Sequence, residues 1–223
     1  YPFYQKAYIL TAHIIEESFV ERLKALQDPR LFIIADQDEQ SAGQDSLDFN
    51  TYSGFNGSDR IDTNTDRLSN GEGSPIDYRY IDDPEAESNL AFSYAELEFT
   101  LAEAAQRGWI TNDPAEHYQA GIEASMAYYE IAGDQVADYL SNPDVAYDPT
   151  GGLEMILREK HTAMFLNSGW EPFYNQRRTG LPVFDVSGDG ILNDGKIPKR
   201  WMYPQDEIEL NLENLTEAID RQY

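Results

Sequence analysis

Apolar residues recur at three- and four-residue steps near the start of the chain, the pattern of a helix with one buried face. The stripe consists of Ala12, Ile15, Phe19, Leu23 and Leu26. It predicts a helix over residues 8–27. The helix should end at Asp28, because the residue before a proline is pushed out of the helical region. The apolar run 31–34 contains β-favouring residues and predicts a short extended segment.

Two further periodic segments predict a pair of neighbouring helices. The first has an apolar face made of Leu90, Tyr94, Leu97, Leu101 and Ala104 or Ala105. Arg107 and Gly108 are typical of its C-terminal end. Asp113 and Pro114 are typical of the start of the second helix, which should run to about residue 131. Its face is formed by Tyr118, Ile122, Ser125 and Tyr129. Together the two segments predict an αα-hairpin.

A third amphipathic helix is predicted after Gly151 and Gly152. Its apolar positions are Leu153, Ile156, Leu157, His161, Met164 and Phe165, and it should end near residues 167–169. Residues 170–178 have no such pattern and predict a loop, and a last, weak helix is expected over 212–221. Trp109, Trp170 and Trp201 are interpreted as core or lid-packing residues. The chain is therefore expected to be all-α and mainly helical, with a long loop-rich insertion and little β-structure.

The loop-rich insertion is expected over residues 36–87. It contains 14 acidic and 3 basic residues, five glycines and no helical stripe, yet it is not poor in aromatic residues. A solvated linker would be poor in aromatic residues, so an ordered and functional loop is predicted. Aromatic rings in loops can stack on sugar faces while polar groups bind the hydroxyls. The candidate ligand-binding residues are Tyr52, Phe55, Asp59, Arg60, Tyr78 and Tyr80, although each ring by itself would more commonly pack against the helices.

Composition and charge exclude several classes of function. The 223 residues include 16 basic and 41 acidic side chains, for a formal charge of −25. Such a chain repels nucleic acid and anionic membrane surfaces. The absence of cysteine removes disulfides, thiolate metal sites and thiol nucleophiles. No histidine pair has metal-binding spacing, and no hydrolase or phosphate-binding motif is present. Paired carboxylates for glycoside hydrolysis stay open, because many acids make chance pairs.

One short motif has the spacing of a calcium loop. Oxygen ligands stand at positions one, three, five and nine, with glycine at six and a carbonyl at seven. The candidate ligands are Asp185, Ser187, Asp189, Ile191 and Asn193. Lys196 occupies position twelve, where a bidentate carboxylate is expected, although Asp194 could substitute. A structural calcium ion and an ordinary Asp/Gly/Asn turn therefore both remain open, and no other cofactor is expected.

The pair Arg177 and Arg178 is the most prominent cationic feature of the acidic chain. Two guanidinium groups could grip a carboxylate ligand. Pairing with acids on the predicted hairpin, such as Glu96, Glu98 or Glu103, is the favoured interpretation, because this chain supplies carboxylates everywhere.

Five blocks of residues, in order, resemble the C-terminal half of a SusD-like (SusD/RagB superfamily) protein, a nutrient-binding outer-membrane lipoprotein of Bacteroidetes. The blocks are Asp28-Pro29-Arg30-Leu31; Ser93-Tyr94-Ala95-Glu96 with Ala102-Glu103-Ala104-Ala105 and Arg107-Gly108-Trp109; Tyr118-Gln119-Ala120-Gly121-Ile122 with Ala124-Ser125-Met126; Glu171 through Arg177-Arg178-Thr179-Gly180-Leu181-Pro182; and Ile197-Pro198-Lys199-Arg200 with Tyr203-Pro204 and Glu207. The resemblance covers nearly the whole chain and is weakest over residues 36–87.

The resemblance implies a larger, mainly helical protein whose other half holds tetratricopeptide-like helices and a lipidated cysteine. Residues 1–223 would be part of one domain, with a loop-rich region at 36–87, a helical core at 88–168 and C-terminal helices and loops at 169–223. Such proteins are not enzymes. They bind glycans or other oligomeric nutrients at the surface of the outer membrane and deliver them to a SusC-like TonB-dependent transporter. Membrane contact would run only through the lipid anchor.

Overall fold

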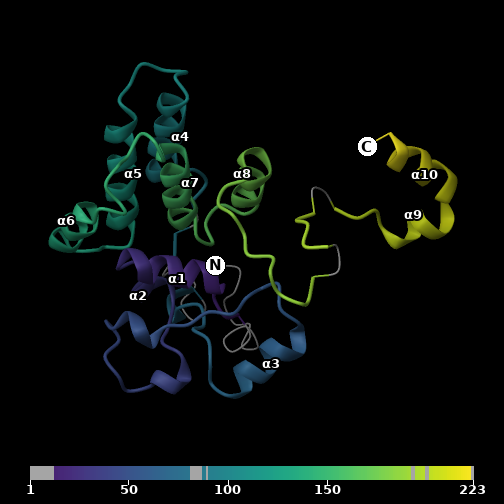
Figure 1. Ribbon diagram of the computed structural model, residues 1–223, viewed down its shortest axis with the longest axis horizontal. Helices are drawn as coiled ribbons and strands as arrows, with labels where there is room; N and C mark the ends of the chain where they lie inside the picture. Colours follow the sequence, from purple (N-terminus) through teal and green to yellow (C-terminus); the bar gives the residue numbers. More distant parts are fainter. Residues whose placement is uncertain (1–12, 81–86, 89, 192–193, 199–200, 222–223) are drawn as a thin grey trace. The chain divides into compact units, whose positions relative to one another are not determined.

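The computed structural model describes residues 13–80, 87–88, 90–191, 194–198 and 201–221. The described chain is mainly helical, and its β-structure is limited to three isolated bridges, which confirms the predicted all-α class. Two compact units are distinguished, Tyr1–Leu192 and Asn193–Tyr223. The second unit contains α9 (Gln205–Leu210) and α10 (Leu212–Asp220) (Figure 1). Helix α10 confirms the predicted last helix, whereas α9 was not predicted.

The predicted hairpin is formed by α4 (Tyr94–Gln106) and α5 (Pro114–Tyr128), with α7 (Gly152–Ala163) packed against both (Figure 1). Local chemistry fixes the two N-termini. The Ser93 hydroxyl accepts a hydrogen bond from Glu96 N (3.0 Å), and the Asp113 carboxylate accepts one from Ala115 N (2.9 Å). The helices approach closely at Gly121, where an added Cβ would lie 2.8 Å from the Phe99 ring.

Helix α4 leaves most of the apolar stripe from which it was predicted exposed or half-buried. Its buried apolar residues are Ala95, Phe99, Ala102 and Ala105, of which the first three belong to the core shared with α5 and α7. Tyr94 and Leu97, from the predicted stripe, are 63% and 38% exposed. The helix was therefore predicted correctly from a face that does not form the core of this chain.

The first helix is shorter than predicted, and the segment after it differs in type. Helix α1 (Glu17–Leu26) begins where the Glu16 carboxylate accepts a hydrogen bond from Phe19 N (3.0 Å). The N-terminal part of the predicted helix 8–27 falls partly on residues 1–12, outside the described residues. The extended segment predicted at 31–34 was wrong, because Leu31–Ile34 forms the short helix α2. Both of its end residues are fully buried.

A buried charge network explains why the chain turns into α2. Arg30 is fully buried, and its guanidinium binds Asp28 through Nε (2.9 Å) and Nη2 (2.5 Å). The same guanidinium donates to Glu159 Oε2 (2.7 Å) and Ser125 Oγ (3.0 Å). Asp28 also accepts a hydrogen bond from Arg30 N (3.0 Å), which closes the turn before α2. The network connects this turn to α5 and α7.

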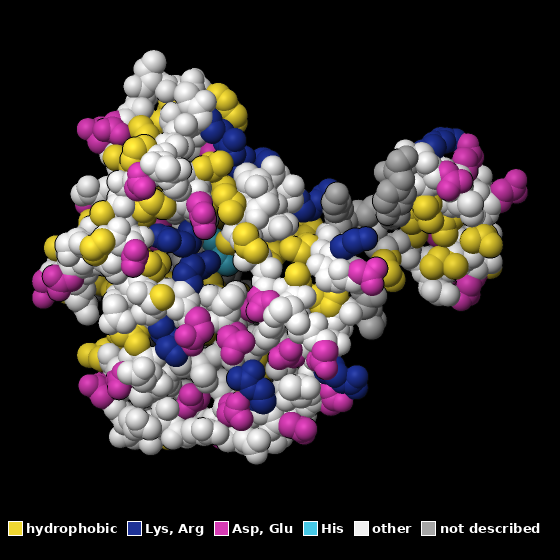
Figure 2. Space-filling view, viewed as in Figure 1, with side chains coloured by type: hydrophobic (Ala, Val, Ile, Leu, Met, Phe, Trp, Pro, Cys, Tyr) yellow, Lys and Arg dark blue, Asp and Glu magenta, His cyan; other side chains and the backbone are white. Residues whose placement is uncertain are grey.

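The loop-rich segment contains more helix than the sequence indicated. It includes α3 (Ile61–Ser69) and three 3-10 turns, η1 (Glu39–Ser41), η2 (Phe49–Thr51) and η3 (Tyr78–Tyr80). No residue of α3 is buried, so its sequence has no core stripe to reveal it. Figure 2 shows acidic side chains spread over the surface of this part of the chain, in the lower part of the view around α3.

Three further differences concern helices and tryptophans. The predicted loop 170–178 is helix α8 (Glu171–Thr179), and α6 (Gly133–Ser141) was also missed. The interpretation of the three tryptophans as core residues was wrong, because Trp109, Trp170 and Trp201 are 69%, 56% and 67% exposed.

The expected pairing of the arginine pair is confirmed for Arg178. Its guanidinium donates to both oxygens of Glu103, at 2.5 and 2.8 Å, and so ties α8 to α4. Arg177 lies over the ring of Phe173 instead.

Candidate functional site

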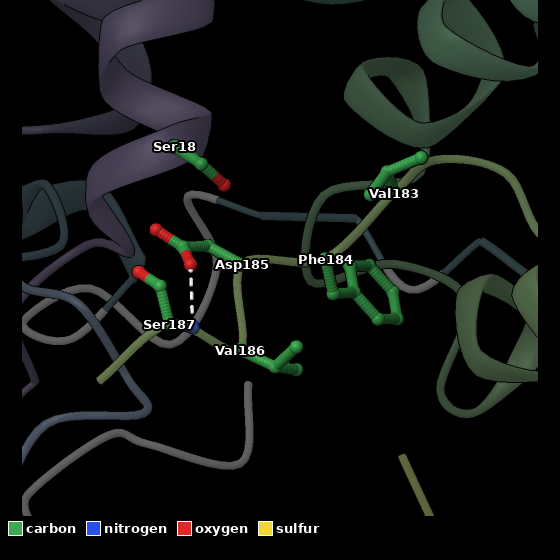
Figure 3. A pocket seen from close by; sticks show the side chains of 6 residues that line it. All are labelled: Ser18, Val183, Phe184, Asp185, Val186 and Ser187. Carbon is green, nitrogen blue, oxygen red and sulfur yellow. Dashed lines mark hydrogen bonds between the residues drawn. The ribbon is translucent and has the colours of Figure 1, made fainter. Parts of the chain in front are cut away.

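A shallow hollow lies between the start of α1 and the segment 183–187 (Figure 3). Its volume is about 440 Å³. The lining residues are Ser18, Val183, Phe184, Asp185, Val186 and Ser187. Figure 3 shows the hydroxyl of Ser18 and the carboxylate of Asp185 directed into the same space, with the ring of Phe184 at the other end. The Ser18 hydroxyl donates to Glu16 Oε2 (2.5 Å), so the hollow combines an apolar ring with oxygens that can accept hydrogen bonds.

The segment that follows this hollow packs directly on residues 56–60. Asn56 Nδ2 donates to Asp185 Oδ2 (3.0 Å), Gly188 N donates to Ser58 Oγ (2.7 Å), and Gly190 N donates to Ser58 O (2.9 Å). A Cβ at either glycine would lie 2.4 Å from the backbone of residues 58–59. Glycine is required at both positions because two backbones meet there.

This contact brings together two sets of residues that the sequence indicated separately. Asp185, Ser187 and Asp189 come from the predicted calcium loop, and Asp59 and Arg60 from the predicted sugar-binding loop. The two segments are about 130 residues apart in sequence. They form a polar edge beside the hollow.

Arg60 is exposed at this edge. Its guanidinium donates to both oxygens of Asp62, each at 3.0 Å. The hydrogen bond to Asp62 raises the pKa of Arg60, and the charge of Asp189 raises it further. Arg60 therefore stays charged between two carboxylates.

The four predicted sugar-binding rings do not share one surface. Tyr52, Phe55 and Tyr80 are only 3%, 8% and 0% exposed, whereas Tyr78 is 57% exposed. The Tyr52 hydroxyl donates to Ser46 O (2.9 Å), so its polar end is satisfied inside the loop. In this structure a sugar ring cannot reach the three buried side chains. Their burial accounts for the ordered state of the loop.

The predicted calcium ligands are only partly described. Asp185 Oδ1 accepts a hydrogen bond from Ser187 N (2.8 Å). A hydrogen bond from the Ser187 side chain, followed by this backbone bond, lowers the pKa of Asp185. Ile191 is half-buried, and Asn193 lies outside the described residues. Among the described residues, no group of three or more histidines or acids is placed to hold a metal ion. The calcium ion stays a prediction.

His161 lies next to the hollow, where its ring contacts that of Phe184 at 6.1 Å between centroids. Arg22 Nη2 lies 3.1 Å from His161 Nδ1, and because arginine can only donate, this nitrogen is the acceptor. Burial, and secondarily the charge of Arg22, lower the pKa of His161 to about 3. The imidazole is therefore neutral at physiological pH and carries no charge into the hollow.

Asp36 and Asp77 form a carboxyl pair joined by a hydrogen bond. Partial burial, followed by the charge of Asp77, raises the pKa of Asp36 from 3.8 to about 6. Because both pKa values are raised, chiefly by burial, the pair keeps one proton, here called the shared proton, to a higher pH than separate carboxylates would.

The shared proton makes stability depend on pH around Asp36. Because its pKa is raised on folding, the pair contributes stability at low pH that is lost as the pH rises through about 6. We expect Asp36→Asn to be more stable than the parent protein at pH 7.5, by at most about 1 kcal/mol because solvent screens this site. At pH 4 the two proteins should have the same free energy of unfolding.

The measurement is thermal unfolding of both proteins across this pH range. Asp66→Asn, which removes an exposed carboxylate from α3, is the control for the general loss of negative charge. An equal gain in both variants, or a gain that persists at pH 4, would contradict the shared proton.

The part of the chain that the structure describes is thus a helical body with long packed loops and a surface hollow beside α1. Residues 4–204 match the SusD-like family model described as starch-binding associating with outer membrane. The chain belongs to this family. The comparison with curated proteins finds no match.

Solved structures agree with the family. A SusD homologue from Bacteroides fragilis is 28% identical, with a TM-score of 0.82 over 94% of this chain and 49% of its own. A second one from the same species is 34% identical, with a TM-score of 0.77 over 92% of this chain and 47% of its own. A chitin-binding protein is 25% identical, with a TM-score of 0.70 over 93% of this chain and 47% of its own. The chain thus spans about half the length of these relatives.

Sequence reasoning missed four of the six residues that line the hollow. Ser18, Val183, Phe184 and Val186 were not singled out, although Phe184 directly precedes the predicted ligand Asp185. An aromatic residue beside an Asp/Ser/Gly loop was the available signal. No sequence signal marked Ser18, because it is far in sequence from residues 183–187 and lies beside them only in the folded protein.

Proposed function

We propose that this protein binds glycans without transforming them, at the hollow between α1 and residues 183–187. The observation that carries the proposal is the hollow itself, in which the Phe184 ring lies beside the Asp185 carboxylate and the hydroxyls of Ser18 and Ser187. Sugars are bound by stacking on apolar rings and by hydrogen bonds to their hydroxyls. The polar edge at Asp59 and Arg60 would extend the contact for a longer oligomer.

Family membership and the relatives support this ligand class. The family description names starch, and one solved relative is named a chitin-binding protein. A chain with a formal charge of −25 favours neutral over anionic oligomers. Starch and chitin oligosaccharides are therefore the first ligands to test.

Binding is tested by isothermal titration with maltooligosaccharides and chitooligosaccharides. We expect Phe184→Ala to weaken binding roughly ten-fold, since a ring stack contributes about 0.5–1.5 kcal/mol beyond its buried area. Asp185→Ala should weaken it by a similar factor through the loss of hydrogen bonds to a hydroxyl. The parent protein should release no reducing sugar from these oligosaccharides over time, because a protein that only binds glycans leaves their glycosidic bonds intact.

Tyr78→Ala is the matched control. Tyr78 is the exposed ring of the loop-rich segment, and it lies outside the hollow. Loss of binding in Tyr78→Ala but not in Phe184→Ala would move the site to the loop. Unchanged binding in both variants would overturn the proposal for this surface. Sugar release abolished by a single carboxylate substitution would favour the alternative, a helical glycoside hydrolase.

The place of action is also a proposal. By its family the protein would work at the surface of the outer membrane, held by a lipid anchor outside this chain, and would deliver its glycan to a SusC-like TonB-dependent transporter. Within the described residues, no helix is both long and apolar enough to cross a membrane. Recovery of a TonB-dependent transporter with the protein purified from native membranes would support delivery.

A further inference from the structure

Arg22, on α1, is a half-buried cation whose described hydrogen bonds are with uncharged groups. Its guanidinium Nη2 donates to His161 Nδ1 (3.1 Å) and Thr162 Oγ1 (3.2 Å). The guanidinium also lies over the Phe19 ring, 4.9 Å from its centroid. Within the described part of the chain Arg22 forms no ion pair, although the sequence supplies 41 acidic residues. Arg22 is therefore a cation that can still pair with an anionic ligand.

The α1–α7 seam, named here for Arg22, Arg158 and His161, contains two buried N–H groups without an acceptor. Arg22 Nε forms no hydrogen bond, and Arg158 Nε lies 3.6 Å from Glu159 Oε1, which is too long for one. Buried donors of this kind are uncommon and call for an explanation. The charges that act most on Arg22 come from Arg30, Arg158, Asp28 and Glu159. Three guanidinium groups therefore share two carboxylates at this place.

The α1–α7 seam adjoins the hollow. Arg22 follows the hollow residue Ser18 by one turn of α1, so both lie on the same side of this helix. His161 contacts Arg22 on one side and the Phe184 ring on the other. Arg22 Nη1 donates to no described residue and, unlike Nε, is open to solvent. Figure 2 shows Lys and Arg side chains gathered between α7 and α1, so the seam supplies the donors that the hollow lacks.

We propose that Arg22 binds the carboxylate of an acidic sugar residue, a hexuronic acid, in the glycan that occupies the hollow. A guanidinium group binds a carboxylate through charge-assisted hydrogen bonds, which an ammonium or an amide matches less well. The sugar ring would stack on Phe184 with its hydroxyls toward Asp185, and its carboxylate would point away from Asp185 to Arg22. The inference rests on the proposed function, and it places one acidic residue in a glycan that the charge of the chain otherwise keeps neutral.

Methyl glucoside and methyl glucuronoside are the matched ligands for the test, because they differ only in the carboxylate at C6. Both are titrated into the protein while the arginine Nε–H signals are followed by NMR. We expect the glucuronoside to bind roughly ten-fold more tightly than the glucoside and to shift the Nε–H signal of Arg22. Arg22→Gln keeps hydrogen-bond donors but removes the charge, and it should lower the affinity for the glucuronoside to that for the glucoside. The same variant assigns the Arg22 signal.

Arg177→Gln is the matched control, because Arg177 also forms no ion pair among the described residues but is exposed on α8, over Phe173. Its affinity for the glucuronoside should equal that of the parent protein. Equal affinities of the parent for the two ligands, an unmoved Arg22 signal, or the same loss in both variants would each overturn the inference, and the first two need no variant to fold.

Neutral oligosaccharides separate this inference from the proposed function. Binding of maltooligosaccharides or chitooligosaccharides that depends on Phe184, without any gain from a carboxylate, would overturn the role of Arg22 and leave the glycan site in place. If neither the neutral oligosaccharides nor the glucuronoside bind at the hollow, both proposals are wrong.

Discussion

Arg30→Met is expected to lower the free energy of unfolding by about 3–5 kcal/mol, since removing one partner of a buried ion pair leaves uncompensated charge. Arg30, Asp28 and Glu159 are at most 1% exposed, and the guanidinium serves both carboxylates. Methionine fills much of the volume but donates no hydrogen bond. Asp28 would then be buried without its cation, and Glu159 would keep only the longer ionic contact to Arg158 Nε (3.6 Å). The measurement is urea unfolding at pH 7. At constant slope, the shift of the urea midpoint gives the change in the free energy of unfolding.

Arg60→Met is the matched control. Arg60 binds Asp62 through Nε and Nη2, the same pair of atoms with which Arg30 binds Asp28, but both partners are more than half exposed. Exposed pairs contribute about 0–1 kcal/mol. Similar losses of unfolding free energy in the two variants would show that burial of the Arg30 network does not determine how much it stabilises the protein.

Phe99→Ala is expected to cost about 3–5 kcal/mol, the usual range for emptying a buried aromatic site. Phe99 is fully buried in α4, contacts the Tyr118 ring at 6.4 Å between centroids, and lies directly against Gly121. The cavity would open where α4 and α5 approach most closely. Because the helices are joined rigidly around this ring, little collapse can fill the space.

Trp109→Ala, just beyond the end of the same helix, is the control for this variant. Trp109 is larger than Phe99 but 69% exposed, and its described contact is with the Arg107 guanidinium at 5.3 Å. We expect a loss below about 1 kcal/mol, measured by the same urea titration. An equal loss in both variants would mean that the core of the hairpin lies elsewhere.

The sequence predicted well the features that depend on neighbouring residues. Asp113 caps the helix that it was expected to start, and the hairpin, α7 and α10 lie close to their predicted positions. Arg178 pairs with Glu103 on α4, as expected for a cation in a chain with so many carboxylates. The family was also recognisable from the sequence, since its blocks are short and local.

Errors arose where a distant contact overrides the local pattern. Residues Leu31–Ile34 favour an extended strand by composition, yet the buried Arg30 network turns them into a helix. The candidate rings Tyr52, Phe55 and Tyr80 were placed in a loop correctly, but only packing decides whether such rings face ligand or core. Helix α3 escaped prediction because it buries nothing.

By itself, then, the sequence determined the helical class, the family, the hairpin and the acidic surface, because periodicity, caps and charge are properties of nearby residues. The tertiary structure decided which face of α4 is buried, which aromatic side chains are accessible, and that residues 56–60 meet residues 185–190. These outcomes depend on contacts between segments up to about 130 residues apart. The free energy of such contacts comes from packing and desolvation at places that no local pattern specifies.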